Sequence, residues 1–340
     1  MAGAGNAGHG HDAADGPTVV ITYHKFGDAP TERGVLAALG ARVVQVDDLD
    51  SPASVAALRV ADALMVTIQP VPAATIAHLD RCRIISRVGT GVDAIDLPAA
   101  TARGIWVTSV PDYAIDEVSA HALALILTHA RRLPTLVAST RRGEWDPKVA
   151  PMPRRLTGQT LGLLGFGRIG RATAARGRGL GFAVIAHDPY VAPAEIAAAG
   201  VRAVDRDTLL RESDYLSLHV PLTAETRGLI DAAALARMQP SAVLVNTARG
   251  EVVDPDALLA AIQAGRLAGA ALDVLPTEPP APDHPLLRDD RVLITPHSAW
   301  SSEESAHDVA VRGAEEVVRV LRGDRPRCPV NEGGAARPAP

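Results

Sequence analysis

The chain has 340 residues, of which 47% are hydrophobic and 21% charged, a composition typical of a folded globular protein long enough for two domains. Its net charge of −5 excludes the basic surface that direct binding of nucleic acid requires, and no apolar run approaches the roughly 18 residues of a membrane span. The two cysteines, Cys82 and Cys328, have neither the number of a disulfide framework nor the spacing of a metal site. We therefore expect a cytoplasmic protein without a metal ion.

Short β-branched runs alternate with alanine-rich stretches along most of the chain, which indicates parallel sheets built from strand–helix units. Residues 1–17 are small and polar, and we expect them to form a disordered tail. The first series of strands is expected at residues 18–23, 42–46, 62–68, 83–89 and 105–110.

A long helix is expected within residues 111–132, where the alternation stops and an apolar helical pattern begins. Asp116 or the residue before it is the expected N-cap. A connector rich in proline and arginine follows at residues 143–158.

A second series of strands begins at residues 160–164 and continues in the segments 182–190, 214–223, 242–250, 268–276 and 292–300. A final helix is expected over residues 301–323, with Ser301 or Ser302 as its cap. Its apolar stripe consists of Val309, Val317, Val318 and Leu321. Residues 332–340 are expected to form a second disordered tail.

A glycine pattern of the form G-x-G-x-x-G occupies Gly165–Gly170, between an apolar run and a helical stretch. The first glycine allows a tight turn, the second lets the backbone approach a pyrophosphate, and the third lets the helix pack closely on the strand. Asp188 ends the next apolar run, where a carboxylate accepts hydrogen bonds from the ribose of the adenosine. Because this anion repels a 2′-phosphate, we expect NAD (NAD+/NADH) in preference to NADP.

Seven motifs occur in one order along the chain: SRVGTGVD, GFGRIG, HDPY, HVPLT, VNTARG, ALDVLPTEP and TPHSAW. In this order they resemble the D-2-hydroxyacid dehydrogenase family (D-isomer specific) over residues 18–331. The segments TPHSAWSSEES, RVGTGVDAID and RPRCPVN look most similar to the C-terminal-binding-protein branch of that family.

The resemblance implies an α/β fold with two Rossmann-like parallel-sheet domains. An NAD-binding domain at residues 110–302 is then inserted into a discontinuous, flavodoxin-like substrate domain made of residues 18–109 and 303–331. The family dimerises through its nucleotide-binding domain, so a homodimer is expected, with the 111–132 helix and the 143–158 connector as candidate contacts.

The resemblance also implies three catalytic residues and an NAD-dependent exchange between a 2-oxo acid and a D-2-hydroxy acid. Arg249 matches the arginine that binds the substrate carboxylate, which a guanidinium does with two parallel hydrogen bonds. His297 matches the general acid–base. Glu278 matches the acid beside it, and a neighbouring carboxylate favours the charged imidazole.

The same resemblance gives two wider sets of residues. The residues expected to bind the cofactor are Thr90, Gly165, Phe166, Gly167, Arg168, Ile169, Gly170, Asp188, His219, Val220, Pro221, Thr226, Thr247, Ala248, Arg249, Asp273, His297 and Ala299. Those expected to contact the substrate are Arg87, Gly89, Thr90, Gly91, Arg249, His297 and Trp300. Trp300 fits packing against the last helix equally well, and His219 also fits a packed histidine at a strand end.

Two other functions stay open at this point. Animal members of the C-terminal-binding-protein branch are NAD(H)-sensing corepressors that bind peptides, and that branch keeps the same three catalytic residues. Phosphoglycerate dehydrogenase is the other alternative, although a phosphate requires cations near Arg87 that the sequence does not clearly place. The short tails favour a metabolic enzyme acting on a small acid.

Overall fold

The structure is a computed structural model and describes residues 16–22 and 29–334. The described residues form two compact units. The first unit holds the residues up to Tyr113 and those from Ala306 onward, and the second unit holds Ala114–Ser305. The chain thus leaves the first unit and returns to it a few residues beyond the two boundaries expected from the sequence.

The first unit is built on a five-stranded parallel sheet in the order β2-β1-β3-β4-β5, the order of flavodoxin-like folds. Its elements in chain order are β1 (Thr18–Thr22), α1 (Pro30–Leu36), β2 (Arg42–Val46), α2 (Pro52–Arg59), β3 (Ala63–Val66), α3 (Ala73–Ile76), β4 (Ile84–Arg87), α4 (Leu97–Ala102), β5 (Trp106–Thr108) and most of α12 (Glu303–Arg322). The five strands expected from the sequence are present, and each lies within its expected range, in several cases one or two residues shorter at an end. Tyr23, expected in the first strand, lies outside the described residues.

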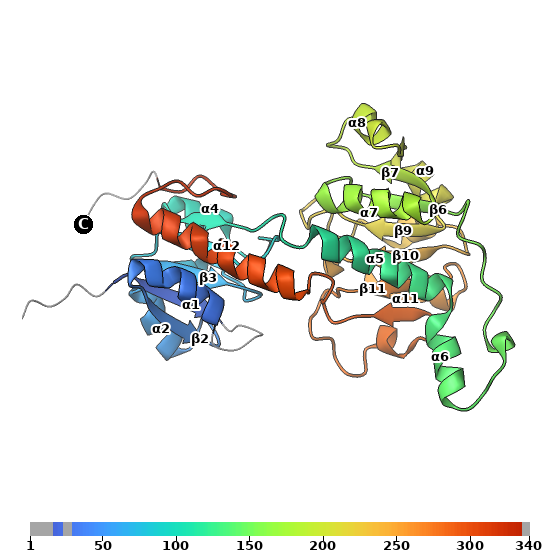
Figure 1. The fold of residues 1–340 in the computed structure, drawn as a ribbon, viewed down its shortest axis with the longest axis horizontal. Coiled ribbons are helices and arrows are strands. Elements are labelled where there is room, and N and C mark those ends of the chain that lie inside the picture. The colour runs from blue at the N-terminus through green and yellow to red at the C-terminus, as the bar shows by residue number, and fades with distance from the viewer. Residues whose placement is uncertain (1–15, 23–28, 335–340) are drawn as a thin grey trace, which may run out of the picture. The chain divides into compact units, whose positions relative to one another are not determined.

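Alternate residues of these strands face opposite sides of the sheet, and both sides are buried. Val20, Leu64 and Ile85 pack with α2, α3 and α4. Val19 and Met65 face the other side, where α1 and α12 cover the sheet (Figure 1). A parallel sheet buried on both faces explains why the strands read as unbroken apolar runs.

The last helix, α12, begins as the sequence analysis expected. The Ser302 hydroxyl accepts the backbone N–H of Ser305 at 2.9 Å, so Ser302 is the N-cap. The expected apolar stripe is also confirmed, with Val309, Val317 and Val318 buried against the first sheet and Leu321 packed beside them. The helix approaches the sheet closely, because the Ser86 hydroxyl donates to the backbone carbonyl of Gly313 at 2.8 Å.

Both tails are shorter than the sequence analysis predicted. Gly334 donates its N–H to the carbonyl of Gly104 at 3.0 Å, so residues 332–334 belong to the folded part rather than to a disordered tail. At the other end, the carbonyl of Pro17 accepts the N–H of Arg42 at 2.9 Å. The remaining tail residues, 1–15 and 335–340, lie outside the described residues.

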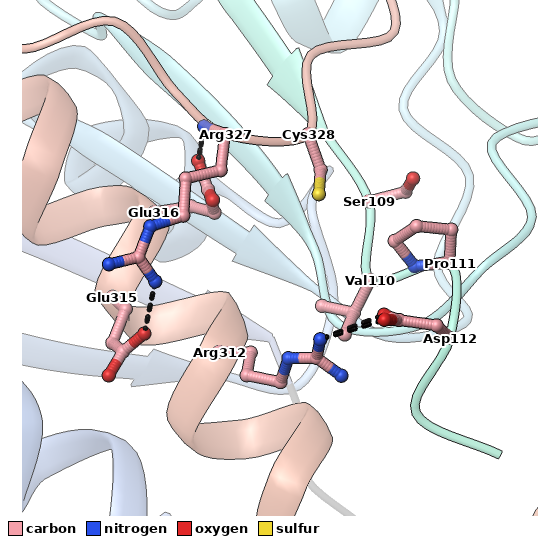
Figure 2. A pocket seen from close by; sticks show the side chains of 9 residues that line it. All are labelled: Ser109, Val110, Pro111, Asp112, Arg312, Glu315, Glu316, Arg327 and Cys328. Carbon is pink, nitrogen blue, oxygen red and sulfur yellow. Dashed lines mark hydrogen bonds and ion pairs between the residues drawn. The ribbon is translucent and has the colours of Figure 1, made fainter.

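The C-terminal segment returns to the first unit beside a hollow of about 70 Å³, shown in Figure 2. Arg312 of α12 pairs with Asp112 at 2.9 Å, and the Arg327 guanidinium pairs with Glu315 at 3.0 Å. The carboxylate of Glu316 accepts the Arg327 backbone N–H at 2.9 Å, while burial raises the pKa of Glu316. The two contacts of Arg327 fix the returning segment on α12, and the pair of Arg312 with Asp112 joins α12 to the residues after β5.

The second unit has a seven-stranded parallel sheet in the order β12-β11-β10-β9-β6-β7-β8, the doubly wound order of dinucleotide-binding folds. Its elements are α5 (Ile115–Ala130), α6 (Leu133–Arg141), β6 (Thr160–Leu164), α7 (Arg168–Gly179), β7 (Ala183–His187), α8 (Pro193–Ala198), β8 (Arg202–Ala203), α9 (Arg206–Glu212), β9 (Tyr215–Leu218), α10 (Ala232–Leu235), β10 (Val243–Asn246), α11 (Pro255–Gln263), β11 (Gly269–Leu272) and β12 (Val292–Ile294). The expected fold class is therefore confirmed in both units.

Helices cover both faces of this second sheet. Leu163 and Val245 face α5, α7 and α8, while Leu216 and Leu244 face α9, α10 and α11. The long helix α5 lies in front of the sheet beside α7 (Figure 1).

The expected cap of α5 is wrong. Ala114 occupies the N-cap position without a side-chain hydrogen bond, and Asp116 lies inside the first helical turn. There its charge still favours the helix dipole, and its carboxylate pairs with Arg176 of α7 at 2.5 Å. The carboxylate therefore joins two helices instead of capping one.

Helix α6, which directly precedes the 143–158 connector, was not expected from the sequence. Apolar side chains of this region are exposed rather than packed. Trp145 is 92% exposed and Met152 is 90% exposed, and Leu133 and Val137 on α6 are also exposed. Such a concentration of exposed apolar side chains is typical of an interaction surface.

Within the described residues, no helix is both long enough and apolar enough to cross a membrane.

Replacing Val317 tests whether α12 completes the first core. Val317 is fully buried, so Val317→Ala removes buried methyl groups and leaves a cavity, and we expect a loss of about 2 kcal/mol in the free energy of unfolding. Urea unfolding followed by circular dichroism measures the loss. Val60→Ala is the matched control, because Val60 is 41% exposed and its truncation should stay within about 0.5 kcal/mol. Equal effects of the two variants would contradict this packing.

Candidate active site

The candidate site lies at the carboxyl-terminal edge of the second sheet. In the strand order, β6 has β7 on one side and β9 on the other, so the connections leave the sheet in opposite directions at this point. Ligands of open parallel sheets bind in the crevice outside such a switch point. The loops after β6, β7, β9, β10, β11 and β12 carry the expected cofactor and catalytic residues of this unit.

Each glycine of the loop after β6 has its own physical reason. Gly165 has φ of +97°, and a Cβ there would lie 2.7 Å from the backbone of His219. A Cβ on Gly170 would lie 2.4 Å from the carbonyl oxygen of Gly165, so the helix packs directly on the turn. At Gly167 an added Cβ would meet nothing within 4 Å. The first and third glycines are thus required by the protein, whereas the second faces open space in which a ligand fits.

Asp188, at the end of β7, is bonded to the glycine loop. One carboxylate oxygen accepts the N–H of Phe166 at 2.7 Å, and the other accepts the N–H of Tyr190 at 2.9 Å. The Tyr190 hydroxyl donates to Glu225 at 2.5 Å, which joins the loop after β7 to the loop after β9. Asp188 therefore fixes the turn beside which it was expected to bind a ribose.

The loop after β9 contains His219, whose Nε2 lies 3.0 Å from the hydroxyl of Ser217. Burial lowers the pKa of His219 to about 4, so its imidazole is neutral at physiological pH. Two residues on, the carbonyl of Pro221 accepts the hydroxyl of Thr226 at 2.6 Å, which closes the loop that begins with Val220.

The loop after β10 presents Arg249. Its guanidinium donates to the carbonyl of Ala248 at 2.8 Å, and its own carbonyl accepts the side-chain amide of Asn246 at 2.8 Å. Thr247 differs from these neighbours, because its hydroxyl is buried and has no hydrogen-bond partner among the described residues. A buried hydroxyl without a partner costs free energy, and a bound ligand would supply that partner.

His297 and Glu278 form a close pair. Nδ1 of His297 lies 2.7 Å from Oε2 of Glu278, and both side chains are about one-third exposed. Burial by itself would raise the pKa of Glu278, but the hydrogen bond and charge of His297, the N–H of Leu275 and the charge of Arg249 together lower it. The carboxylate is therefore ionised at neutral pH, and it leaves Nε2 of His297 for another partner.

The loop Thr295–Ala299 is wrapped around the buried carboxylate of Asp273. This carboxylate accepts the N–H groups of Ser298 and Ala299, both at 2.9 Å, and the hydroxyl of Thr295 at 2.5 Å. His297 donates its backbone N–H to the Asp273 carbonyl at 2.8 Å and has φ of +51°, a conformation uncommon for residues other than glycine. Asp273 was expected to lie near the cofactor, and here it organises the loop that carries His297.

Two residues of this network were missed by the sequence analysis. Nε2 of His121, on α5, lies 3.0 Å from the hydroxyl of Thr295 and 3.5 Å from the Asp273 carboxylate. No sequence signal identified either one, because His121 reads only as the polar end of an apolar helical run.

Trp300, expected to contact substrate or to pack, donates its indole N–H to the carbonyl of His297 at 3.1 Å.

The residues of the first unit that were expected to contact the substrate lie at the end of β4 and in the loop after it. Arg87 donates from its guanidinium to the carbonyl of Val88, and it lies over Gly89, where an added Cβ would collide with it. The Thr90 hydroxyl donates to the carbonyl of Val110 at 3.1 Å, and Gly91 continues the loop. Nowhere in residues 16–22 or 29–334 do three or more His, Cys, Asp or Glu side chains gather as metal ligands.

The residues of the second unit fit a nicotinamide dinucleotide. Gly167 leaves open space at the N-terminus of α7, where the backbone amides favour a pyrophosphate. Asp188 stands at the end of the neighbouring strand, and Thr247 has a hydroxyl without a partner among the described residues.

Comparisons with known proteins agree with this geometry. Residues 123–299 match the family described as "D-isomer specific 2-hydroxyacid dehydrogenase, NAD binding domain". The chain is 43% identical over 261 residues to a D-3-phosphoglycerate dehydrogenase of Archaeoglobus fulgidus, covering 77% of this chain and 49% of that protein. It is 40% identical over 268 residues to a glyoxylate reductase of Korarchaeum cryptofilum, covering 77% of this chain and 80% of that protein. The chain thus spans about half the length of the phosphoglycerate dehydrogenase it matches.

A solved structure gives the same result for the fold. The D-lactate dehydrogenase of Aquifex aeolicus, solved with NAD and lactic acid, superposes with a TM-score of 0.82 at 31% identity and covers 90% of this chain and 96% of that one. The family match covers more than half of the chain, and both relatives are at least 40% identical to it. The chain therefore belongs to the D-isomer specific 2-hydroxyacid dehydrogenase family.

Proposed function

We propose that this protein interconverts a 2-oxo acid and a D-2-hydroxy acid with NAD as the hydride carrier. The observation that carries the proposal is the 2.7 Å pair of His297 and Glu278, which occupies the same strand edge as the glycine loop. An imidazole held by an ionised carboxylate is the general acid–base that a carbonyl reduction needs. Membership of the D-isomer specific 2-hydroxyacid dehydrogenase family supports this proposal.

His297 moves the proton in this reaction. In the direction of reduction, its Nε2 protonates the carbonyl oxygen of the 2-oxo acid, and in oxidation it takes the proton back from the hydroxyl. Glu278 accepts Nδ1–H, orients the ring and stabilises its positive charge. Arg249 binds the substrate carboxylate with two hydrogen bonds and so orients the carbonyl. When bound, the nicotinamide supplies or accepts the hydride at the substrate carbon.

The chain's own residues favour NAD over NADP. The Asp188 carboxylate lies at the end of β7, where its negative charge opposes a 2′-phosphate and its lone pairs suit ribose hydroxyls. The D-lactate dehydrogenase of Aquifex aeolicus, to which this chain is similar, was solved with NAD. Thr247 and the backbone around Gly167 would hold the rest of the dinucleotide.

Phosphoglycerate is the second candidate substrate, because the relative with 43% identity is named D-3-phosphoglycerate dehydrogenase. In the first unit, Arg87 offers one positive charge for such a phosphate. Similarity to the glyoxylate reductase of Korarchaeum cryptofilum, of which the match covers 80%, favours glyoxylate and related small acids. Resemblance to the C-terminal-binding-protein branch stays a prediction from the sequence.

We further propose that the protein forms a homodimer through α6 and the 143–158 connector. Trp145 and Met152 are at least 90% exposed, although burying such side chains is strongly favourable. Leu133 and Val137 extend the apolar surface along α6. A second copy of the same chain would cover this surface.

Initial rates of NADH oxidation with a panel of 2-oxo acids test the main proposal. The panel contains glyoxylate, hydroxypyruvate, pyruvate, phosphohydroxypyruvate and a bulky apolar acid. We expect turnover of at least one acid, and a fall in kcat/KM of about 10³-fold in His297→Ala, because the proton donor is lost. His284→Ala, outside the candidate site, serves as the control and should keep native rates. Tight NADH binding without any turnover would instead favour the peptide-binding alternative.

Neutralising Glu278 tests its role in the pair. Glu278→Gln keeps an acceptor for Nδ1 of His297 but removes the negative charge that stabilises a positive ring. Because the positive charge on the ring then has no ionic partner, we expect kcat/KM for reduction to fall about tenfold or more. Initial rates of NADH oxidation measure the fall, with Glu212→Gln as a surface control. A native kcat/KM in Glu278→Gln would show that the charge of Glu278 does not assist His297.

Adding a methyl group to the glycine loop separates ligand space from protein packing. Gly167→Ala places its Cβ in open space, so the melting temperature should stay close to native while NADH affinity falls about tenfold or more. Gly170→Ala places a Cβ 2.4 Å from a backbone oxygen, so it should lower the melting temperature. Thermal unfolding and fluorescence titration with NADH measure both. Unchanged NADH affinity in Gly167→Ala would remove the cofactor from this loop.

Charging the exposed connector tests the dimer. Native protein should sediment as a dimer, and the double variant Trp145→Glu/Met152→Glu should sediment as a monomer, because two buried charges would oppose association. Leu287→Glu, at another exposed apolar residue, should remain dimeric. A native monomer at micromolar concentration would contradict the proposal.

A further inference from the structure

We propose that His121 and Thr295 are positioning residues that hold the His297 loop in place through the buried carboxylate of Asp273. The proposal rests on the function proposed above, in which His297 transfers the proton. His121 lies on α5, far from the strand ends in sequence, and neither it nor Thr295 belongs to the expected catalytic or cofactor residues.

The direction of the hydrogen bonds follows from the chemistry of the three groups. The Asp273 carboxylate already accepts two main-chain N–H groups, and the Thr295 hydroxyl donates to it across 2.5 Å, a short O–H···O bond. The hydroxyl has a single proton and therefore accepts from His121, whose Nε2 lies 3.0 Å away. Nε2 of His121 thus carries a proton, and the bonds run in one sense from His121 through Thr295 to Asp273.

This chain of bonds ends where the His297 loop is held. The Asp273 carboxylate is 1% exposed and accepts the N–H groups of Ser298 and Ala299, the two residues after His297. The left-handed backbone of His297, with φ of +51°, turns these two N–H groups toward the carboxylate. Because this conformation is uncommon for residues other than glycine, we expect the position of the ring to depend on how firmly Asp273 holds the loop.

Helix α5 bonds both ends of the segment. His121 bonds the hydroxyl of Thr295, and Glu117, one turn earlier on α5, accepts the hydroxyl of Ser302 at 2.7 Å. Residues four apart lie on the same helix face, so one face of α5 fixes the whole segment from Thr295 to Ser302. The segment carries the proton donor and is otherwise a loop outside the sheet.

Hydrogen exchange tests the proposal without relying on catalysis. His121→Leu and Thr295→Val remove the donor and the hydroxyl, so the Ser298 and Ala299 amides should exchange about tenfold faster than in the native protein. His121→Gln and Thr295→Ser keep the donor and the hydroxyl, and they should stay within about threefold of native. His129→Leu is the matched control, because His129 is a buried histidine on the same helix and makes no described bond to this loop.

Steady-state kinetics then connect the loop to proton transfer. In His121→Leu and Thr295→Val we expect kcat to fall about tenfold while KM for the 2-oxo acid stays within about twofold. The groups that bind the substrate remain in these variants, but the general acid His297 is misplaced. The kcat of the double variant should be no lower than that of the less active single variant, because both changes break the same chain of hydrogen bonds. Native kcat should return in His121→Gln.

The outcomes separate the two proposals. If Ser298 and Ala299 exchange at native rates in His121→Leu and Thr295→Val, the positioning role is wrong, whatever the rates of turnover. If both variants keep native kcat while their amides exchange faster, the loop is held but does not position the acid, and the inference is overturned. If the exchange pattern holds and native protein reduces no acid in the panel, the role of His121 in holding the loop is supported while the proposed function fails.

Discussion

A carboxylate that is buried or half-buried at the end of a parallel strand needs hydrogen-bond donors, and this requirement shapes the edge of the second sheet. Asp188 takes its donors from the glycine loop and from its own turn. Asp273 takes them from the loop that follows the neighbouring strand β12. In both places main-chain N–H groups are among the donors, so the carboxylate determines the path of the backbone. The loops with the expected cofactor and catalytic residues are thus built around negative charges.

The architecture was largely predictable from the sequence, because strands buried on both faces appear as unbroken apolar runs. The glycine pattern was equally predictable, because Gly165 and Gly170 lie so close to neighbouring backbone atoms that a Cβ would collide with them. The cap of α5 was not, because Asp116 favours a helix start equally well inside the first turn or at the cap. Helix α6 was missed because much of its apolar surface is exposed and shows no buried stripe.

The candidate site was predictable only where it follows motifs. Arg249, Glu278 and His297 lie far apart in sequence, and resemblance to a family brought them together before the fold did. The structure adds the 2.7 Å contact of His297 with Glu278 and the lowered pKa of that carboxylate. His121 carried no signal, because its partners lie more than 150 residues away along the chain. Long-range hydrogen bonds of this kind leave no local pattern in a single sequence.

The placement of the three tryptophans has a spectroscopic consequence. Trp106 belongs to the first unit, Trp145 is almost wholly exposed in the connector, and the indole N–H of Trp300 is bonded to the carbonyl of His297. Each region therefore carries its own natural fluorophore. Variants that retain one indole at a time would report separately on the first unit, the connector surface and the loop that carries His297, without any introduced label.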